Sequence, residues 1–241
     1  MPSVSIGIEL ASEPFLIPIW FYSYSFLVYA ISALISALVA YFAYKFFKMT
    51  KTKSSLMLVF SFLFLTAAYS TLSFTSLYTY LYKPYFQVNF NLGSLSFVNS
   101  VGLSLYYITS MIAYVALFVM YLPEIKELKK LFKREIKSKL SVLYVPLWYQ
   151  SLMDFHLVSI LILAYVALRN VANFYKKRDV NSFLVMSAFI LIVSSHAALL
   201  FLEFDPTIYI AANTLLVAGF SSLLIMLIRV SSGGKSRKSR K

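Results

Sequence analysis

Six long apolar runs dominate this chain and limit what it can fold into. They cover residues 15–47, 54–82, 95–122, 142–168, 183–204 and 207–228. About 20 consecutive apolar residues are enough for a helix to cross a bilayer, so each run can form one transmembrane helix. Backbone groups in lipid must form hydrogen bonds within their own segment. The runs therefore predict an all-α, polytopic helical membrane protein.

The composition supports the same class. Of 241 residues, 60% are hydrophobic and 13% are charged, with a mean hydropathy of +0.77. Soluble domains have about 45–50% apolar and about 25% charged residues. The chain has no cysteine, which excludes disulfides, thiolate metal sites and cysteine catalysis. We expect a multi-pass protein of the cell membrane, with the lipid bilayer as its main partner.

The net charge of +13 is concentrated in short blocks between the apolar runs and in the C-terminal tail. Such blocks mark the cytoplasmic side of membrane proteins and attract anionic lipid headgroups. We therefore expect the basic loops and tail to contact lipid, and we expect no nucleic-acid partner. Apolar residues recur every three or four positions between the third and fourth runs, which predicts a basic amphipathic linker.

The two tryptophans of the chain occur in matching settings and indicate an internal repeat. Pro18-Ile-Trp20 aligns with Pro146-Leu-Trp148 at an offset of 128 residues, and the same offset aligns Phe46 with Phe174. We expect two related three-helix halves. The predicted order is an external N-terminal segment, a first half, a basic linker, a second half and a basic tail, at residues 1–14, 15–122, 123–141, 142–229 and 230–241.

The number of crossings is six or seven. Six crossings divide the basic residues equally, 11 to 11, between the two sides and give the halves opposite orientations. A seventh crossing between Lys139 and Arg169 would put 21 of the 22 basic residues on the cytoplasmic side, but the 29 intervening residues cannot hold two full spans. We favour six full spans and keep seven as the alternative.

The candidate site lies on the fourth and fifth runs, which hold both histidines of the chain, His156 and His196. Counted from a basic turn at residues 169–178, both rings lie roughly 20 Å away, at the same depth. Asp154 and Glu203 lie near them in the sequence. Ionisable side chains inside a bilayer are costly and often functional. At the repeat offset the two histidines correspond to apolar residues of the first half, so the duplication does not explain them.

Three interpretations of the histidines stay open. Two neutral imidazoles at equal depth could hold one haem b and carry electrons. A path through Asp154, His156, His196 and Glu203 could instead move protons or cations. In the third interpretation, the histidines only hydrogen-bond across the hairpin or to nearby serines, and the two carboxylates lie in water at the interface.

We expect a non-enzymatic membrane subunit or anchor of a larger complex, with other membrane subunits as partners and haem b as the candidate cofactor. A small transporter or proton or cation pathway, and a membrane sensor module, are the alternatives. The chain has no HExxH, GxSxG or P-loop motif, and two histidines cannot build a three-histidine zinc site. No catalytic residue or metal ligand is assigned.

Overall fold

A computed structural model describes residues 19–89, 92–122, 152–202 and 207–238. Within these ranges the chain forms six helices, each long and apolar enough to cross a membrane. They are α2 (Ile19–Thr50), α3 (Lys53–Asn89), α4 (Leu92–Tyr121), α6 (Leu152–Lys177), α7 (Val180–Leu199) and α8 (Thr207–Lys238). The described part thus has the all-helical, multi-pass architecture that the apolar runs predict. The external segment 1–14 and the linker 123–141 lie outside the described residues.

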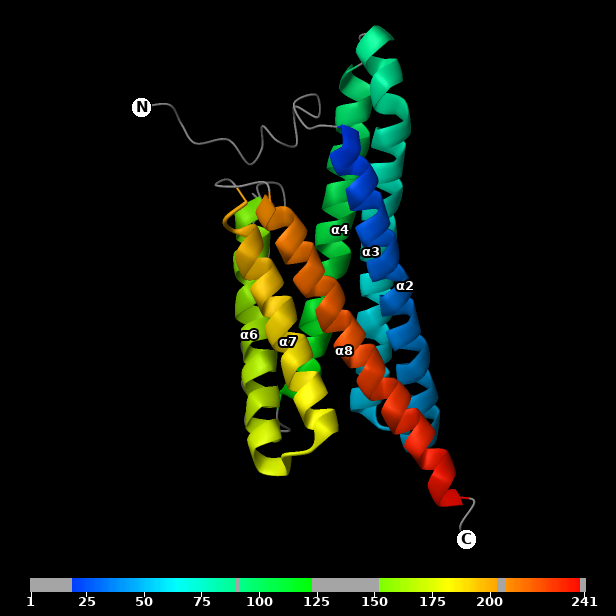
Figure 1. The fold of residues 1–241 in the computed structure, drawn as a ribbon, viewed down its shortest axis with the longest axis vertical. Coiled ribbons are helices and arrows are strands. Elements are labelled where there is room, and N and C mark those ends of the chain that lie inside the picture. The colour runs from blue at the N-terminus through cyan, green and yellow to red at the C-terminus, as the bar shows by residue number, and fades with distance from the viewer. Residues whose placement is uncertain (1–18, 90–91, 123–151, 203–206, 239–241) are drawn as a thin grey trace, which may run out of the picture.

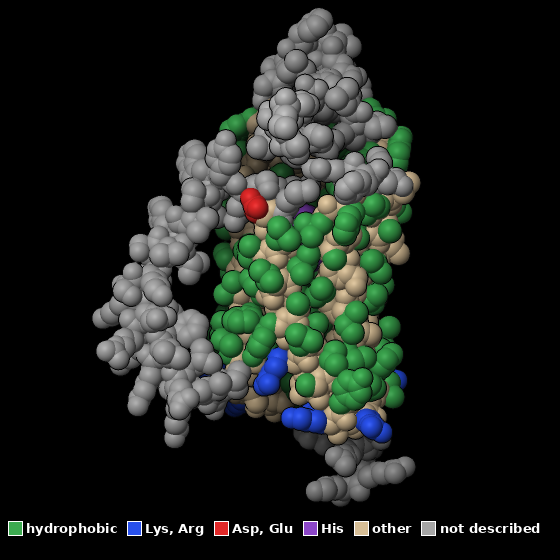
Figure 2. Space-filling model, turned by 90° about the vertical axis from the view of Figure 1, so that its left-hand side faces the viewer, with side chains coloured by type: hydrophobic (Ala, Val, Ile, Leu, Met, Phe, Trp, Pro, Cys, Tyr) green, Lys and Arg blue, Asp and Glu red, His purple; other side chains and the backbone are tan. Residues whose placement is uncertain are grey.

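The helices present apolar side chains outward and many polar ones inward. Leu34, Phe74 and Leu161 are more than 60% exposed, whereas Ser36 and Ser61 are fully buried. Figure 2 shows apolar side chains covering the middle of the bundle. Lipid is as apolar as leucine, so helices in a membrane associate through small residues and polar contacts rather than through burial of apolar surface. The pattern therefore fits a bundle surrounded by lipid.

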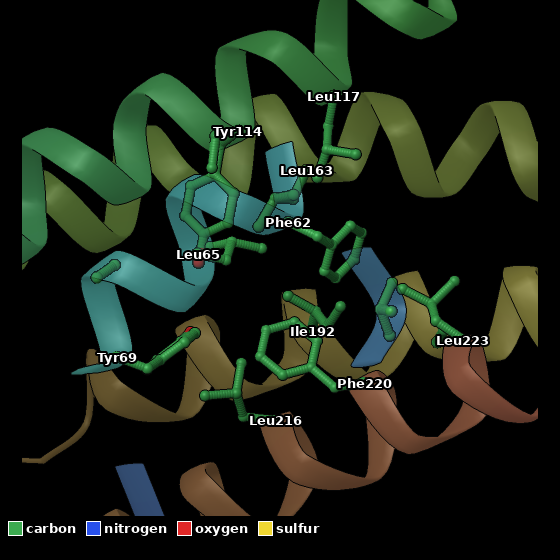
Figure 3. Packing of buried hydrophobic residues seen from close by; sticks show 14 of the residues in the cluster. Phe62, Leu65, Tyr69, Tyr114, Leu117, Leu163, Ile192, Leu216, Phe220 and Leu223 are labelled. Carbon is green, nitrogen blue, oxygen red and sulfur yellow. The ribbon is translucent and has the colours of Figure 1, made fainter. Parts of the chain in front are cut away.

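The six helices form a closed ring. Each helix packs against the next along the chain, α4 packs against α6, and α8 returns to pack against α2 (Figure 1). One half of the ring interior is filled by seven apolar side chains from five helices, all at most 2% exposed, which point toward one another in Figure 3. We call this cluster the apolar plug; its members are Phe62, Leu65, Leu117, Leu163, Ile192, Phe220 and Leu223.

Helices α4 and α6 run in the same direction. Tyr107 in the first half of α4 stacks on Phe155 near the start of α6, with ring centroids 4.4 Å apart. Tyr121, at the end of α4, donates a 3.1 Å hydrogen bond to Asn170 in the second half of α6. The two halves therefore have the same orientation, and the opposite orientation expected from six crossings is wrong. The chain between α4 and α6 joins opposite ends of the bundle.

The α2–α3 turn and the α6–α7 turn have the same geometry. Each has two residues, and the first, Lys51 or Arg178, has a φ of 50° and a 2.7 Å hydrogen bond to the carbonyl four residues earlier. The second, Thr52 or Asp179, accepts a hydrogen bond from the backbone N–H three residues later. Hydrogen bonds from Ser182 also lower the pKa of Asp179, so this cap is charged at neutral pH. Equivalent positions lie 127 residues apart, one fewer than the sequence alignment predicts.

Two predicted loops are helical instead. Residues 169–177 form the last turns of α6, because lysines near a helix C-terminus are favourable in the field of the helix dipole. The interval left between the second and third apolar runs, residues 83–94, is also largely helix, since α3 continues through Pro84 to Asn89 and α4 begins at Leu92. Thr79 donates a 2.8 Å hydrogen bond to Asn99 and ties the two helices together in this region.

The described basic residues gather at one end of the bundle, which we call the basic end. It comprises the last turns of α2, α6 and α8 and the first turns of α3 and α7. In Figure 2, lysine and arginine side chains lie at this end of the visible face and an acidic side chain lies toward the other. Lys83, at 3% exposure, lies toward the opposite end, on the second half of α3. The positive-inside rule predicts that the basic end faces the cytoplasm.

A substitution at Gly102 tests the close contact between α3 and α4. A Cβ added at Gly102 would collide with the side chain of Thr75, so Gly102→Ala should destabilise the protein by about 1–3 kcal/mol. Thr75→Ala in the same chain should restore most of the loss, because it removes the clashing atoms. Thermal unfolding in detergent measures both effects.

Gly219→Ala is the matched control: Thr75→Ala should not restore the stability that it loses, because its added Cβ does not meet Thr75. Its Cβ would meet the backbone oxygen of Ala188 at 2.9 Å, and no truncation of a side chain removes that atom. An unchanged melting temperature for Gly102→Ala would contradict the packing described for α3 and α4.

Candidate functional site

A cavity of about 260 Å³ lies inside the ring, and all six described helices contribute to its wall. Its residues come from the first parts of α2, α4, α6 and α8 and from the last parts of α3 and α7. The cavity therefore lies in the half of the bundle away from the basic end. Most of the wall is aromatic or aliphatic, with hydroxyl, amide and imidazole groups among the apolar ones. None of the described wall residues is acidic, lysine or arginine.

Both histidines lie on the cavity wall and bond directly to each other. The Nδ1 atoms of His156 on α6 and His196 on α7 are 2.9 Å apart, and the two side chains are 3% and 2% exposed. The Nε2 atom of His196 lies 2.9 Å from the hydroxyl of Tyr114 on α4. The two histidines therefore lie at one depth and hydrogen-bond across the hairpin, as the third interpretation describes. Tyr114 is a partner that sequence reasoning did not identify.

The hydrogen bonds from Tyr114 through His196 to His156 can run in either direction. In one, Tyr114 donates to Nε2 of His196, and Nδ1–H of His196 donates to His156. In the other, His156 donates to Nδ1 of His196, and Nε2–H of His196 donates to Tyr114. A neutral imidazole has one donor and one acceptor nitrogen, so both arrangements are possible with all three groups uncharged, and Nε2 of His156 takes part in neither. Reversal shifts protons along these two hydrogen bonds, and it also requires His156 to release its Nε2 proton and Tyr114 to take up a new one.

Of the two carboxylates predicted for a proton or cation path, the structure describes only one. Asp154 is exposed in the first turn of α6, where a negative charge is favourable in the field of the helix dipole. Glu203 lies outside the described residues. Of the four residues predicted for a proton or cation path, the structure therefore brings His156 and His196 together, while Asp154 lies two residues away on the exposed start of the same helix.

The histidine pair does not fit a haem held between the two rings. A metal–nitrogen bond is about 2 Å long, so an iron ligated from both sides would hold the two nitrogens about 4 Å apart. The facing Nδ1 atoms are 2.9 Å apart, and Nε2 of His196 is already bonded to Tyr114. The rings leave no space for a porphyrin. In the described ranges, no three histidine or acidic side chains group as a metal site requires.

A second hydrogen-bonded group joins α8 to α2 on the cavity wall. The hydroxyl of Tyr209 lies 2.9 Å from Oγ of Ser25 and 2.7 Å from the hydroxyl of Tyr29. Ser25 donates its own proton to the carbonyl of Phe21, and the hydroxyl of Tyr209 is the donor toward both Ser25 and Tyr29, so its one proton is shared between them. Sequence reasoning missed this group because its members do not differ from the many other tyrosines and serines of the chain.

Tyr69 on α3 contributes a buried hydroxyl with no hydrogen-bond partner. Its side chain is 0% exposed and lines the cavity, and its ring stacks near that of Tyr29, with centroids 6.3 Å apart. The hydroxyls of Tyr106 and Tyr114 lie close to it, and neither completes a well-aligned hydrogen bond with it. A buried hydroxyl without a partner costs about 1–3 kcal/mol. The cavity is the place from which a partner can reach it.

Comparison of the chain with protein-family models, with curated proteins and with solved structures finds no match. The function must therefore be argued from the cavity and its hydrogen-bonding groups.

A double-mutant cycle tests the bond between the histidines. His196→Leu leaves Nδ1 of His156 and the hydroxyl of Tyr114 without their partner, so it should lower the melting temperature, and His156→Leu should do the same. The double variant should lose less than the sum, with a coupling of about 0.6–1.7 kcal/mol, as for other hydrogen bonds between membrane helices. Tyr114→Phe is the control, because it removes the hydrogen bond between Tyr114 and His196 and leaves the bond between the two histidines in place. Strict additivity of the two histidine variants would contradict the direct contact.

Proposed function

We propose that this multi-pass protein is a small transporter of the cell membrane, and that the central cavity is its substrate site. The proposal rests on the order of three features along the axis of the ring: the cavity, then the apolar plug, then a second pocket. A cavity walled by all the described helices, with a few convergent polar groups, is the usual form of a small-molecule site. A subunit that only anchors a complex has no need of such a cavity.

The apolar plug supports transport rather than a continuous channel. Its seven side chains fill the ring between the cavity and the basic end, and all are at most 2% exposed. Without a polar group among them, water and ions have no continuous path. A substrate in the cavity is thus separated from the basic end until the helices rearrange.

The second pocket, of about 330 Å³, lies at the basic end. Its wall comes from the ends of α4 and α6, the start of α7 and one residue of α8, and it is polar, with Asn170, Asn173, Lys177 and Asp179 among its residues. Two pockets at opposite ends with an apolar barrier between them are what alternating access to a site requires.

The orientation of the helices adds support for the predicted repeat. Both halves have the same orientation, and the α2–α3 and α6–α7 turns have the same geometry at an offset of 127 residues. At this offset His156 and His196 correspond to Tyr29 and Tyr69, which line the same cavity, rather than to the apolar residues that the offset of 128 indicated. Parallel repeats are one of the arrangements that recur in transporters, although that is an analogy of fold.

We also infer that the connection between the halves crosses the membrane. Helices α4 and α6 run in the same direction, so residues 123–151 must return from one side to the other. With this crossing, 21 of the 22 basic residues lie on one side of the membrane, as the positive-inside rule favours.

Single cysteines test the proposal without knowledge of the substrate, because the chain has no cysteine of its own. Ser195, on the cavity wall, is 1% exposed in the closed ring. Ser195→Cys should react with a small, membrane-impermeant thiol reagent both in intact cells and in inside-out vesicles, because a transporter opens its site to each side in turn. The labelled fraction, measured by mass, gives the result.

Two further cysteines provide the controls. Ser61→Cys replaces a fully buried serine outside the cavity and should react from neither side. Ser182→Cys lies at the basic end and should react only in inside-out vesicles. Reaction of Ser195→Cys from a single side would show a fixed binding site, as in a sensor, and would contradict transport.

A proton path is the second candidate, favoured by the reversible hydrogen bonds from Tyr114 to His156. It predicts that proteoliposomes containing the protein dissipate an imposed pH gradient, measured with an internal pH-sensitive dye. His196→Leu should abolish this flux, and Tyr114→Phe should also abolish it, because the phenylalanine ring cannot pass on a proton. Ser61→Ala should have no effect. Equal flux in Tyr114→Phe would exclude this route.

A further inference from the structure

We infer that the ligand of the central cavity is a small, uncharged molecule with one aromatic ring and a hydroxyl group, of the phenol class. This inference rests on the proposed function and names the substrate class. It follows from four properties of the wall: its charge, its shape, its unused hydrogen-bonding groups and its volume.

Among the described residues, the wall has none that would compensate a charged ligand. No described wall residue is acidic, lysine or arginine, and the imidazoles of His156 and His196 are engaged with each other. Lys83, the nearest basic side chain, lies against the ring of Tyr22, with Nζ 5.2 Å from the ring centroid, and is not a wall residue. An ion without a partner is expensive to bury, so the cavity selects uncharged molecules.

Two aromatic pairs contribute to the cavity wall from helices on opposite sides of the ring. Tyr29 and Tyr69 are on α2 and α3, and His156 and His196 are on α6 and α7. In the closed ring, α2 lies opposite α6 and α3 lies opposite α7. Aromatic rings prefer offset-stacked or edge-to-face contacts at centroid distances of about 4.5–7 Å. A flat ring between the pairs can make such contacts with both.

Two polar groups on these pairs are available to a ligand. The hydroxyl of Tyr69 is fully buried without a hydrogen bond, and Nε2 of His156 makes none of the hydrogen bonds described for the pair. A hydroxyl on the ligand can accept from one of them and donate to the other. The rest of the wall is mainly aromatic or leucine, which disfavours a molecule with many hydroxyls, since each would lose its hydration without a new partner.

The volume limits the ligand to a small molecule. The cavity measures about 260 Å³, whereas sites for drug-sized ligands occupy about 300–1,000 Å³. A substituted phenol fits within this space.

The test measures protection of Ser195→Cys, with four probes of different chemistry: 4-ethylphenol, 4-hydroxybenzoate, tyramine and glucose. At neutral pH the first is uncharged, the second an anion and the third a cation, and the fourth is uncharged without an aromatic ring. We expect 4-ethylphenol to slow labelling in a saturable manner and the other three to have no effect at the same concentration. Tyr69→Phe should weaken protection roughly tenfold, the equivalent of one hydrogen bond of about 1.4 kcal/mol.

Ethylbenzene is the matched ligand control, because it lacks the hydroxyl. Its protection should be equal in the parent and in Tyr69→Phe, which also shows that the variant retains the cavity. Stronger protection by 4-hydroxybenzoate, tyramine or glucose, or none by 4-ethylphenol, would overturn the inferred class while labelling of Ser195→Cys from both sides still supports transport. Absence of that labelling would instead refute the proposed function.

Discussion

The hydrophobic effect between helices that are already in lipid is weak, and this decides which contacts hold the ring together. Such helices gain little by burying leucine against leucine, so close approach and polar contacts must hold them together. Gly102 against Thr75 provides one close approach, and Tyr209 closes the ring by bonding α8 to α2. The contact of His196 with His156 and Tyr114 joins three helices. Except for Tyr114, the polar groups among these contacts also line the cavity, so the side chains that stabilise the ring belong to the proposed ligand site as well.

Much of the fold could be predicted because length and hydropathy decide whether a segment crosses a membrane. The wrong predictions rested on local sequence features that occur both in loops and within helices. The second apolar run was expected to end at residue 82, but α3 continues through Pro84, and the lysines at the end of α6 extend that helix rather than forming a loop. The relative direction of α4 and α6 was not predictable from six apolar runs, although the one-sided distribution of basic residues in a seven-crossing chain already indicated it.

Only part of the site could be predicted. The histidines were identified because they are rare and ionisable, and their equal depth follows from the two helices being antiparallel. Tyr69, Tyr114 and Tyr209 could not be distinguished among 19 tyrosines, since apolar residues surround each helix and no face stands out. Their roles depend on which helices lie opposite one another in the ring. That arrangement follows from contacts between segments far apart in the sequence.

The matched turns have a consequence for the origin of the cavity. If both halves descend from one three-helix ancestor, two copies of it in parallel would have enclosed a cavity on their two-fold axis. The same pair of residues would then have faced that axis twice. Tyr29 with Tyr69 and His156 with His196 would be the descendants of one pair, changed to phenols in one copy and imidazoles in the other. A symmetric cavity would thereby have gained two chemically different walls, which could orient an unsymmetrical ligand.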